Sequence, residues 1–422
     1  MSISRRAILS GMAAVVVGRS ARQPVILLRS GWQTVNIGDI AHTPGALAVI
    51  YKHMPEAEVI LWPNLLDRGV EPMLRRNFPR LGIVQKAEEI DVAFRKADLL
   101  IHGSAPSVTS QSQMDSWRNE TGKPYGFFGI GFTIAGEAAG TALSPSLRET
   151  LSSSQFIYTR ETASLANLRQ VGITGPLLGF APDGAFSMEI RNDRAADEFL
   201  KANGLEDRRF IALIPRLRYT PYHKIRPVSW SEAEIRRRTE ANERHQEPDH
   251  AKLREVIAAW VRETGCKALV CPEMTYQLDI IGPLVYDPLP AQVKRSVVRR
   301  KTYWLPDEAA SVYRRAVAVI SFECHSPIIA AAQGTPCMYV HQPQDGIKGQ
   351  MWKDIGLGDW YFEIDETSGA EISQRVLDIW AEFAKARKKV DEAVAYARRL
   401  QDDAMRHISA LAGQAAGLRR RS

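Results

Sequence analysis

Side chains that can carry acid–base chemistry on an anion follow an apolar segment late in the sequence. Residues 317–320 are apolar and mostly β-branched, which predicts a buried strand. Glu323 and His325 come directly after it in a short polar turn. Ser326 followed by Pro327 is typical of a helix start. An imidazole and a carboxylate beside a helix N-terminus, where anions bind, could hold an anionic group and transfer a proton to it.

Three arginines follow other predicted strands and could hold a carboxylate or a phosphate group. Arg160 comes after the strand predicted at 155–159, and Arg216 and Arg218 come after the strand predicted at 210–214. Guanidinium groups bind both anions through paired hydrogen bonds. Arginines, a histidine and carboxylates in one crevice would suit an anionic small substrate, although Arg160 could instead only pair with the glutamate next to it.

A third polar loop, at residues 29–39, follows the first apolar segment of the chain. It contains Asn36, Gly38 and Asp39 and precedes a helix predicted at 41–51. In a parallel sheet, such a loop forms part of the ligand crevice. Asn36 and Asp39 could bind a ligand or could only stabilise the turn by bonding nearby backbone, and the sequence leaves both interpretations open.

The sequence predicts neither a metal site nor a dinucleotide cofactor. It has no G-x-G-x-x-G loop, no C-x2-C pair, and no histidine–carboxylate cluster with metal-ligand spacing. The cysteines fall on or beside predicted strands, where small buried cysteines are ordinary. They are Cys266, Cys271, Cys324 and Cys337. Their spacing does not require a disulfide and does not exclude one.

The elements that must position these loops alternate between strands and helices along most of the chain. This alternation predicts an α/β fold with two Rossmann-like, doubly wound domains, at 23–190 and 191–370. The charged stretch 220–247 could be a lid or a solvent-exposed helix. Residues 371–422 are expected to form C-terminal helices, which pack back across the domains, and a basic tail.

The formal net charge of +7 lies at the two ends of the chain. Seven arginines account for all of it: Arg5, Arg6, Arg19, Arg22, Arg419, Arg420 and Arg421. The rest of the chain therefore lacks the basic excess that a nucleic-acid-binding domain carries. No apolar run is long enough to cross a bilayer. We expect no nucleic-acid partner and no transmembrane span.

The first 22 residues have the pattern of an export signal. Arg5 and Arg6 precede a moderately apolar segment at 7–18, and the pattern resembles a twin-arginine signal. We therefore expect export to the periplasm or cell envelope. The alternative is a basic leader on a cytoplasmic protein.

Five short segments stand in a fixed order along the chain. They are 36–39 (NIGD), 129–131 (GIG), 158–161 (YTRE), 182–186 (PDGAF) and 325–336 (HSPIIAAAQGTP). In this order they resemble the polysaccharide pyruvyl transferase family, and the resemblance covers about residues 25–365. It implies a GT-B-like fold with the active site between two domains. It also implies transfer of a pyruvyl group from phosphoenolpyruvate to hydroxyls of a cell-envelope polysaccharide or exopolysaccharide.

The resemblance also implies roles for individual residues. His325 would be the acid or a phosphate ligand, and Asp39 would act on the acceptor hydroxyl. The substrate-binding residues at matching or neighbouring positions would be Asn36, Gly38, Arg160, Arg216, Arg218 and Glu323. Phosphoenolpyruvate or another anionic donor and a polysaccharide acceptor are the implied partners, with no cofactor. No oligomeric state follows from the resemblance.

Glu323 departs from the family, whose members commonly have an arginine at this position. A charge pair 4 Å apart is worth roughly 4 kcal/mol near a protein surface. We therefore expect Arg216, Arg218 or Lys348 to compensate the carboxylate. The alternatives are a related GT-B-like glycosyltransferase with another donor and a non-catalytic, exported glycan-binding protein.

Overall fold

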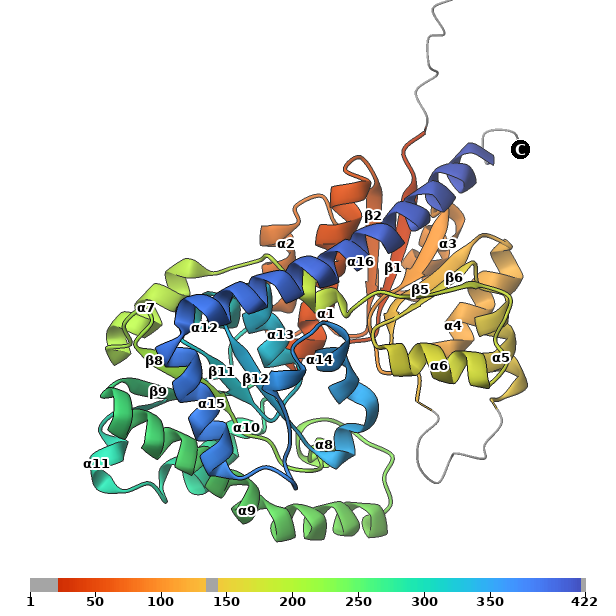
Figure 1. Cartoon of the computed structure of the whole chain (residues 1–422). Helices are drawn as coiled ribbons and strands as arrows, with labels where there is room; N and C mark the ends of the chain where they lie inside the picture. The colour runs from red at the N-terminus through yellow and green to blue at the C-terminus, as the bar shows by residue number, and fades with distance from the viewer. Residues whose placement is uncertain (1–21, 134–142, 419–422) are drawn as a thin grey trace, which may run out of the picture.

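The computed structural model describes residues 22–133 and 143–418, which form two parallel α/β units (Figure 1). Within these residues the first sheet has seven strands in the order β3-β2-β1-β4-β5-β6-β7. The strands are β1 Val25–Ser30, β2 Glu58–Pro63, β3 Gly82–Ile83, β4 Leu99–His102, β5 Tyr125–Ile130, β6 Phe156–Thr159 and β7 Leu177–Phe180. The helices between them are α1 Ile37–His53, α2 Val70–Asn77, α3 Ala87–Lys96, α4 Gln111–Ser116, α5 Pro145–Ser152 and α6 Thr162–Gln170.

The second described sheet has six parallel strands in the order β10-β9-β8-β11-β12-β13. The strands are β8 Phe210–Ile214, β9 Lys267–Val270, β10 Val297–Arg299, β11 Val319–Ser321, β12 Cys337–His341 and β13 Tyr361–Glu363. The accompanying helices are α7 Asp193–Asn203, α8 Tyr222–Ile225, α9 Glu232–Thr264, α10 Gln277–Ile280, α11 Ala291–Lys294, α12 Pro306–Tyr313, α13 His325–Ala332, α14 Gln350–Asp354 and α15 Gly369–Ala381. Two parallel, doubly wound sheets confirm the predicted fold class.

Both sheets turn the carboxyl ends of their strands toward the boundary between the two units. β1 leads into α1 and β11 leads into α13, so the N-termini of these two helices meet there. α1 also packs against the short 3-10 helix η3 at Gly184–Ser187, which follows β7. One buried apolar cluster continues from Ile26 to Ala412 through both units. The two domains therefore share one continuous apolar core.

One prediction about local structure is wrong. Ser326 does not cap α13, because the helix already begins at His325 and Cys324 stands at the cap position. The backbone N–H of Ser326 instead donates to Glu273 Oε2 at 2.6 Å. The helix expected as one alternative within residues 220–247 is present, since α9 begins at Glu232 with Ser231 at its cap, but it continues through Pro248 to Thr264.

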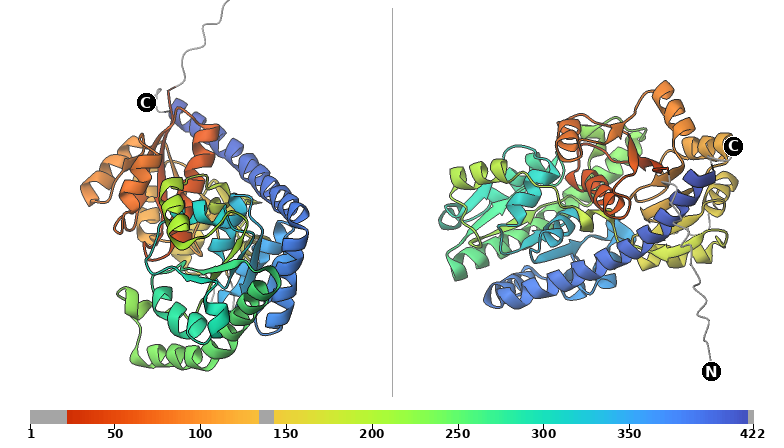
Figure 2. Two further views of the ribbon diagram at one scale, coloured as in Figure 1. Left: turned by 90° about the vertical axis from the view of Figure 1, so that its left-hand side faces the viewer. Right: turned by 90° about the horizontal axis from the view of Figure 1, so that it is seen from above.

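A second long helix, α16 at Phe383–Leu418, crosses both domains, as expected (Figures 1 and 2). It contacts β1, β4 and α1 in the first domain and α13 and α15 in the second. Its buried Gln401 accepts a hydrogen bond from Ser187 Oγ and donates to the carbonyl oxygens of Pro182 and Asp183. α16 thereby fixes the segment that carries Asp183.

The expectations about the termini and the cysteines have different outcomes. The twin-arginine-like segment lies outside the described residues, and so does the basic tail after 418. The four cysteines are free and buried. Among the described helices, none is both long and apolar enough to cross a membrane.

Gln401→Leu should lower the urea midpoint of unfolding. Three polar groups around the side chain would lose their partner, and an unsatisfied buried group costs about 1–3 kcal/mol. Arg399→Ala, an exposed change on the same helix, is the control and should shift the unfolding free energy by less than about 0.5 kcal/mol. Equal midpoints for the two variants would show that α16 does not depend on this contact.

Candidate active site between the two domains

A cavity of about 340 Å³ lies between the two domains, at the carboxyl ends of their strands. Loops after β1, β4 and β6 line it from the first domain, and loops after β8, β9 and β11 line it from the second. Ligands bind at this edge in open α/β sheets. Six of the residues predicted for the site line it: Asn36, Asp39, Arg160, Arg216, Glu323 and His325.

Asn36 joins the two domains and begins α1. Its side-chain oxygen accepts hydrogen bonds from the backbone N–H groups of Gly38 at 2.7 Å and Asp39 at 3.3 Å. The backbone beside it pairs with the second domain, because Ile37 N donates to Glu273 O at 3.0 Å. Asn36 thus has the turn-stabilising role that the sequence allowed, while Asp39 stands half-buried in the cavity wall.

Gly38 allows α1 and α13 to approach each other closely. A Cβ atom on Gly38 would lie 2.2 Å from the Cβ of His325 and 2.5 Å from its Cγ. Such distances are far inside van der Waals contact, so no larger residue fits without a shift of one helix. Gly38 therefore acts by placing His325 and not by contacting the cavity.

His325 and His42 form a buried pair of imidazoles. Their Nε2 atoms lie 2.9 Å apart, and the rings meet edge to face with centroids 4.7 Å apart. His42 Nδ1 lies 3.2 Å from the carbonyl oxygen of Ser104, which suits an Nδ1–H donor. His325 Nδ1 lies 3.6 Å from Glu273 Oε1. Asp183 faces both rings, with its Oδ2 3.3 Å from His42 Nε2 and 3.9 Å from His325 Nε2.

The two histidines differ in their electrostatic surroundings. Burial lowers the pKa of His42 to about 4, and the attraction of Asp183 offsets this only in part. Burial also acts to lower the pKa of His325, but Cys324, Glu273 and Asp183 outweigh it and raise that pKa well above its ordinary value. One imidazole is thus held neutral and the other is surrounded by groups that favour positive charge.

Arg160 lies on the first-domain side of the cavity and is buried. Its Nε is 3.2 Å from Glu161 Oε2, and its Nη1 is 3.5 Å from Asp183 Oδ2. The pairing with the adjacent glutamate that the sequence allowed is therefore present. Because Arg160 also lines the cavity, its guanidinium faces the ligand space as well.

Arg216 pairs with the carboxylate of Glu323. The sequence predicted such compensation by Arg216, Arg218 or Lys348. Arg216 Nε lies 3.2 Å from Glu323 Oε2, and its Nη1 lies 2.8 Å from Asp345 Oδ2. Gln277 donates to the other oxygen of Glu323 at 2.9 Å. Burial raises the pKa of Glu323 to about 8, although Arg216 acts against this shift. Lys348 approaches Asp345 at 3.4 Å and lines the cavity beside Arg216.

The structure does not bring Arg218 to the cavity. Its guanidinium makes paired hydrogen bonds to Asp249 on α9 and to Asp365 after β13. Residues i and i+2 of a regular strand face the same side, but β8 ends at Ile214 and the chain bends at Arg218, so its side chain turns to these two carboxylates instead of the cavity. Arg218 thus links α9 to the sheet.

Sequence reasoning missed two groups that the structure places beside His325. His42 lies inside an apolar helix, where nothing in its spacing marked it. Asp183 lies in the PDGAF segment, which was noticed for the resemblance only. His102 at the end of β4 does not line the cavity: its Nδ1 donates to Gly103 O at 2.8 Å, and its Nε2 accepts a hydrogen bond from the backbone N–H of Thr109 at 3.0 Å.

Comparison with solved structures defines the class of protein. The UDP-GlcNAc 2-epimerase of Neisseria meningitidis, bound to UDP-GlcNAc, superposes with a TM-score of 0.54 at 10% identity, over 88% of this chain and 95% of that chain. Anabaena HepE in complex with UDP-glucose gives a TM-score of 0.52 at 12% identity, over 94% and 100%. The fold is therefore GT-B-like.

The sequence profile of polysaccharide pyruvyl transferases matches residues 36–340. The chain belongs to the polysaccharide pyruvyl transferase family, which makes it a transferase-type, glycan-modifying protein. No curated protein matches the sequence significantly.

Gly38→Ala should destabilise the protein, because the added methyl group overlaps His325. Overpacking of this kind costs about 1–3 kcal/mol, so we expect a lower thermal midpoint. Gly413→Ala is the matched control, since nothing lies within 4 Å of a Cβ at this exposed position of α16. Replacing this helical glycine by alanine should raise the free energy of unfolding by up to about 1 kcal/mol. A neutral Gly38→Ala would contradict the close approach of α1 and α13.

Arg218→Met should lower the free energy of unfolding by about 3–5 kcal/mol, because it leaves the buried carboxylate of Asp249 without its partner. Asp365→Asn is the control. The Asp365 side chain is 52% exposed, so loss of its ion pair with Arg218 should lower the free energy of unfolding by less than about 1 kcal/mol. Urea denaturation of both variants measures the difference. Equal losses would mean that Arg218 does not act as a buried structural link.

Proposed function

We propose that the protein transfers a pyruvyl group from phosphoenolpyruvate to hydroxyl groups of a polysaccharide and forms a ketal. The observation that carries this proposal is the set of charged side chains that line the cavity. Arg160, Arg216, Arg226 and Lys348 line the cavity together with His325. Phosphoenolpyruvate brings a phosphate, a carboxylate and a carbon that must be protonated, which together require cations and an acid at one place. Membership of the family supports the same assignment.

The donor would lie across the domain boundary. Lys348 and Arg216 belong to the second domain and Arg160 to the first, so one dianionic ligand could contact cations from both. Each hydrogen bond between charged partners contributes about 1.5–3 kcal/mol. A ligand held in this way would also hold the two domains together.

The chemistry follows from the groups along the wall. A proton delivered to the methylene carbon leaves an oxocarbenium-like carbon, and His325 with the groups around it is the source of that proton. An acceptor hydroxyl then attacks this carbon and gives up its proton, for which Asp39 is available in the wall. A second hydroxyl displaces phosphate as its own proton leaves, which closes the ketal.

A second candidate is transfer of a sugar from a nucleotide-sugar donor. Arg216 is already paired with Glu323 and Asp345, so less of its charge is available for phosphoenolpyruvate. Two of the similarly folded proteins are complexes with UDP-GlcNAc and UDP-glucose. A diphosphate could use Arg160 and Lys348 and leave the pairs of Arg216 intact.

Calorimetric titration of the full chain with phosphoenolpyruvate tests the proposal. We expect binding in the micromolar range, and Lys348→Met should weaken it roughly 10- to 100-fold, because a charged contact is lost. Above pH 8, where Glu323 carries its charge, Glu323→Gln should strengthen binding by about tenfold, and near pH 6, where Glu323 is already neutral, it should change the affinity little. Arg237→Met, an exposed change on α9, should leave the affinity unchanged.

Phosphate release with a polysaccharide acceptor is the matching activity measurement. Binding of UDP-sugars without binding of phosphoenolpyruvate would overturn the pyruvyl donor in favour of the second candidate. Glycan binding without turnover of either donor would indicate a non-catalytic protein.

A further inference from the structure

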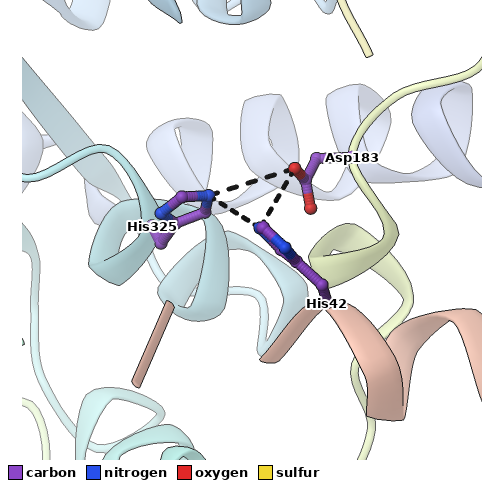
Figure 3. A group of neighbouring side chains, drawn as sticks. All are labelled: His42, Asp183 and His325. Atoms are coloured by element: carbon purple, nitrogen blue, oxygen red, sulfur yellow. Dashed lines mark hydrogen bonds and ion pairs between the residues drawn. The ribbon is translucent and has the colours of Figure 1, made fainter. Parts of the chain in front are cut away.

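Three atoms of metal-binding type converge beside the cavity. They are Nε2 of His42, Nε2 of His325 and Oδ2 of Asp183, and their side chains point toward one another (Figure 3). The distances between them are 2.9 Å, 3.3 Å and 3.9 Å. His42 comes from α1, His325 from α13 and Asp183 from the turn before η3. The three elements pack directly on one another.

These distances fit a small divalent cation. The point equidistant from the three atoms in their common plane lies about 2.0 Å from each of them, and an ion slightly above this plane, with a fourth ligand on that side, keeps the length of a bond from zinc to imidazole nitrogen or carboxylate oxygen. Two imidazoles and one carboxylate are also a common ligand set for zinc and related metals.

The remaining polar atoms of the three side chains are held in the way that metal ligands require. His42 Nδ1 faces the carbonyl oxygen of Ser104, which leaves the lone pair of Nε2 directed at the shared point. The other oxygen of Asp183, Oδ1, accepts a hydrogen bond from the backbone N–H of Ala185 at 3.0 Å. His325 Nδ1 lies 3.3 Å from Cys324 Sγ and 3.6 Å from Glu273 Oε1. A carboxylate behind a ligating imidazole raises the basicity of the ring and fixes its orientation.

The local charge also favours a cation at this point. Asp183 and Glu273 are fully buried, and Glu161 is nearly so. Among the described residues, Arg160 is the cation that contacts Asp183. Asp183 Oδ2 accepts no hydrogen bond from the part of the chain that the structure describes. A buried carboxylate oxygen without a donor is costly, and a cation between it and the imidazoles would remove this cost.

We propose that His42, Asp183 and His325 bind one divalent transition-metal ion, such as Zn²⁺, with its fourth coordination position facing the cavity. His42 and His325 both line that cavity, so a water molecule or a substrate oxygen can reach the ion. Three protein ligands with one open position are typical of catalytic zinc sites. There the ion would polarise a bound oxygen or lower the pKa of bound water, and this water would take the place of the His325 imidazole as the group that supplies or accepts the proton. The proposal does not depend on the identity of the donor.

Metal titration of the purified full chain, after dialysis against a chelator, tests the site without donor or acceptor. We expect one equivalent of Zn²⁺ with a dissociation constant of about a micromolar or below. Co²⁺ should give the visible absorption spectrum of a four-coordinate site with nitrogen and oxygen ligands. Asp183→Asn and His42→Gln should each weaken Zn²⁺ binding by at least about tenfold, since one ligand is lost.

His245→Ala is the matched control. It removes a histidine from a second, more exposed group with Asp249 and Asp365, and binding of the one equivalent should not change. If the affinity falls in His245→Ala and stays in Asp183→Asn, the ion binds elsewhere and the proposal is wrong. If a variant does not fold, the parent protein still tests the proposal, because it must bind one equivalent of Zn²⁺ and give the Co²⁺ spectrum of a four-coordinate site. Failure of the parent to bind either ion would mean that the imidazoles share a proton instead.

Discussion

The close approach of the N-termini of α1 and α13 at Gly38 and His325 is the constraint on which the site depends. Helix α1 begins just after a strand of the first sheet, and α13 begins just after a strand of the second, so their contact sets the position of one domain on the other. The 2.2 Å distance from a Cβ at Gly38 to the Cβ of His325 leaves room for glycine only. His42, one turn further along α1, is thereby brought against His325.

Burial of charge is the second feature that shapes the site. Arg160 and Arg216 are each less than a tenth exposed, and each is paired with two carboxylates. Buried ions are tolerated where partners and hydrogen bonds surround them, and removing one partner leaves an uncompensated charge. Glu323 belongs to this network through Arg216, so its carboxylate is not simply an unfavourable charge in front of an anionic ligand. The network presents cations to the cavity from both domains, Arg160 from the first and Arg216 from the second.

The fold alone does not decide the chemistry at this cavity. GT-B-like proteins with about one residue in ten identical to this chain include an epimerase and a UDP-glucose complex, and one fold hosts many reactions. Family membership narrows the reaction to glycan modification. What is particular to this chain is the pairing of Glu323 with Arg216 and the placement of His42 and Asp183 beside His325. Substitutions of these residues are therefore the way to test which donor the protein uses and whether it binds a metal ion.

The sequence by itself determined the elements and their order. Apolar β-branched runs and the loops between them predicted most of the strands, though not β7, β10 or β13, and six of the residues in the cavity wall. This was possible because strand periodicity and the position of a loop after a strand are local properties. It could not separate Arg216 from Arg218, because the bend after β8 and the distant carboxylates Asp249 and Asp365 turn Arg218 away from the cavity. It also could not extend α9 through Pro248, since packing outweighs local preference there. Only the tertiary structure brought together His42, Asp183 and His325, which come from parts of the chain up to 283 residues apart, because their proximity is set by how three helical elements pack and not by spacing along the chain.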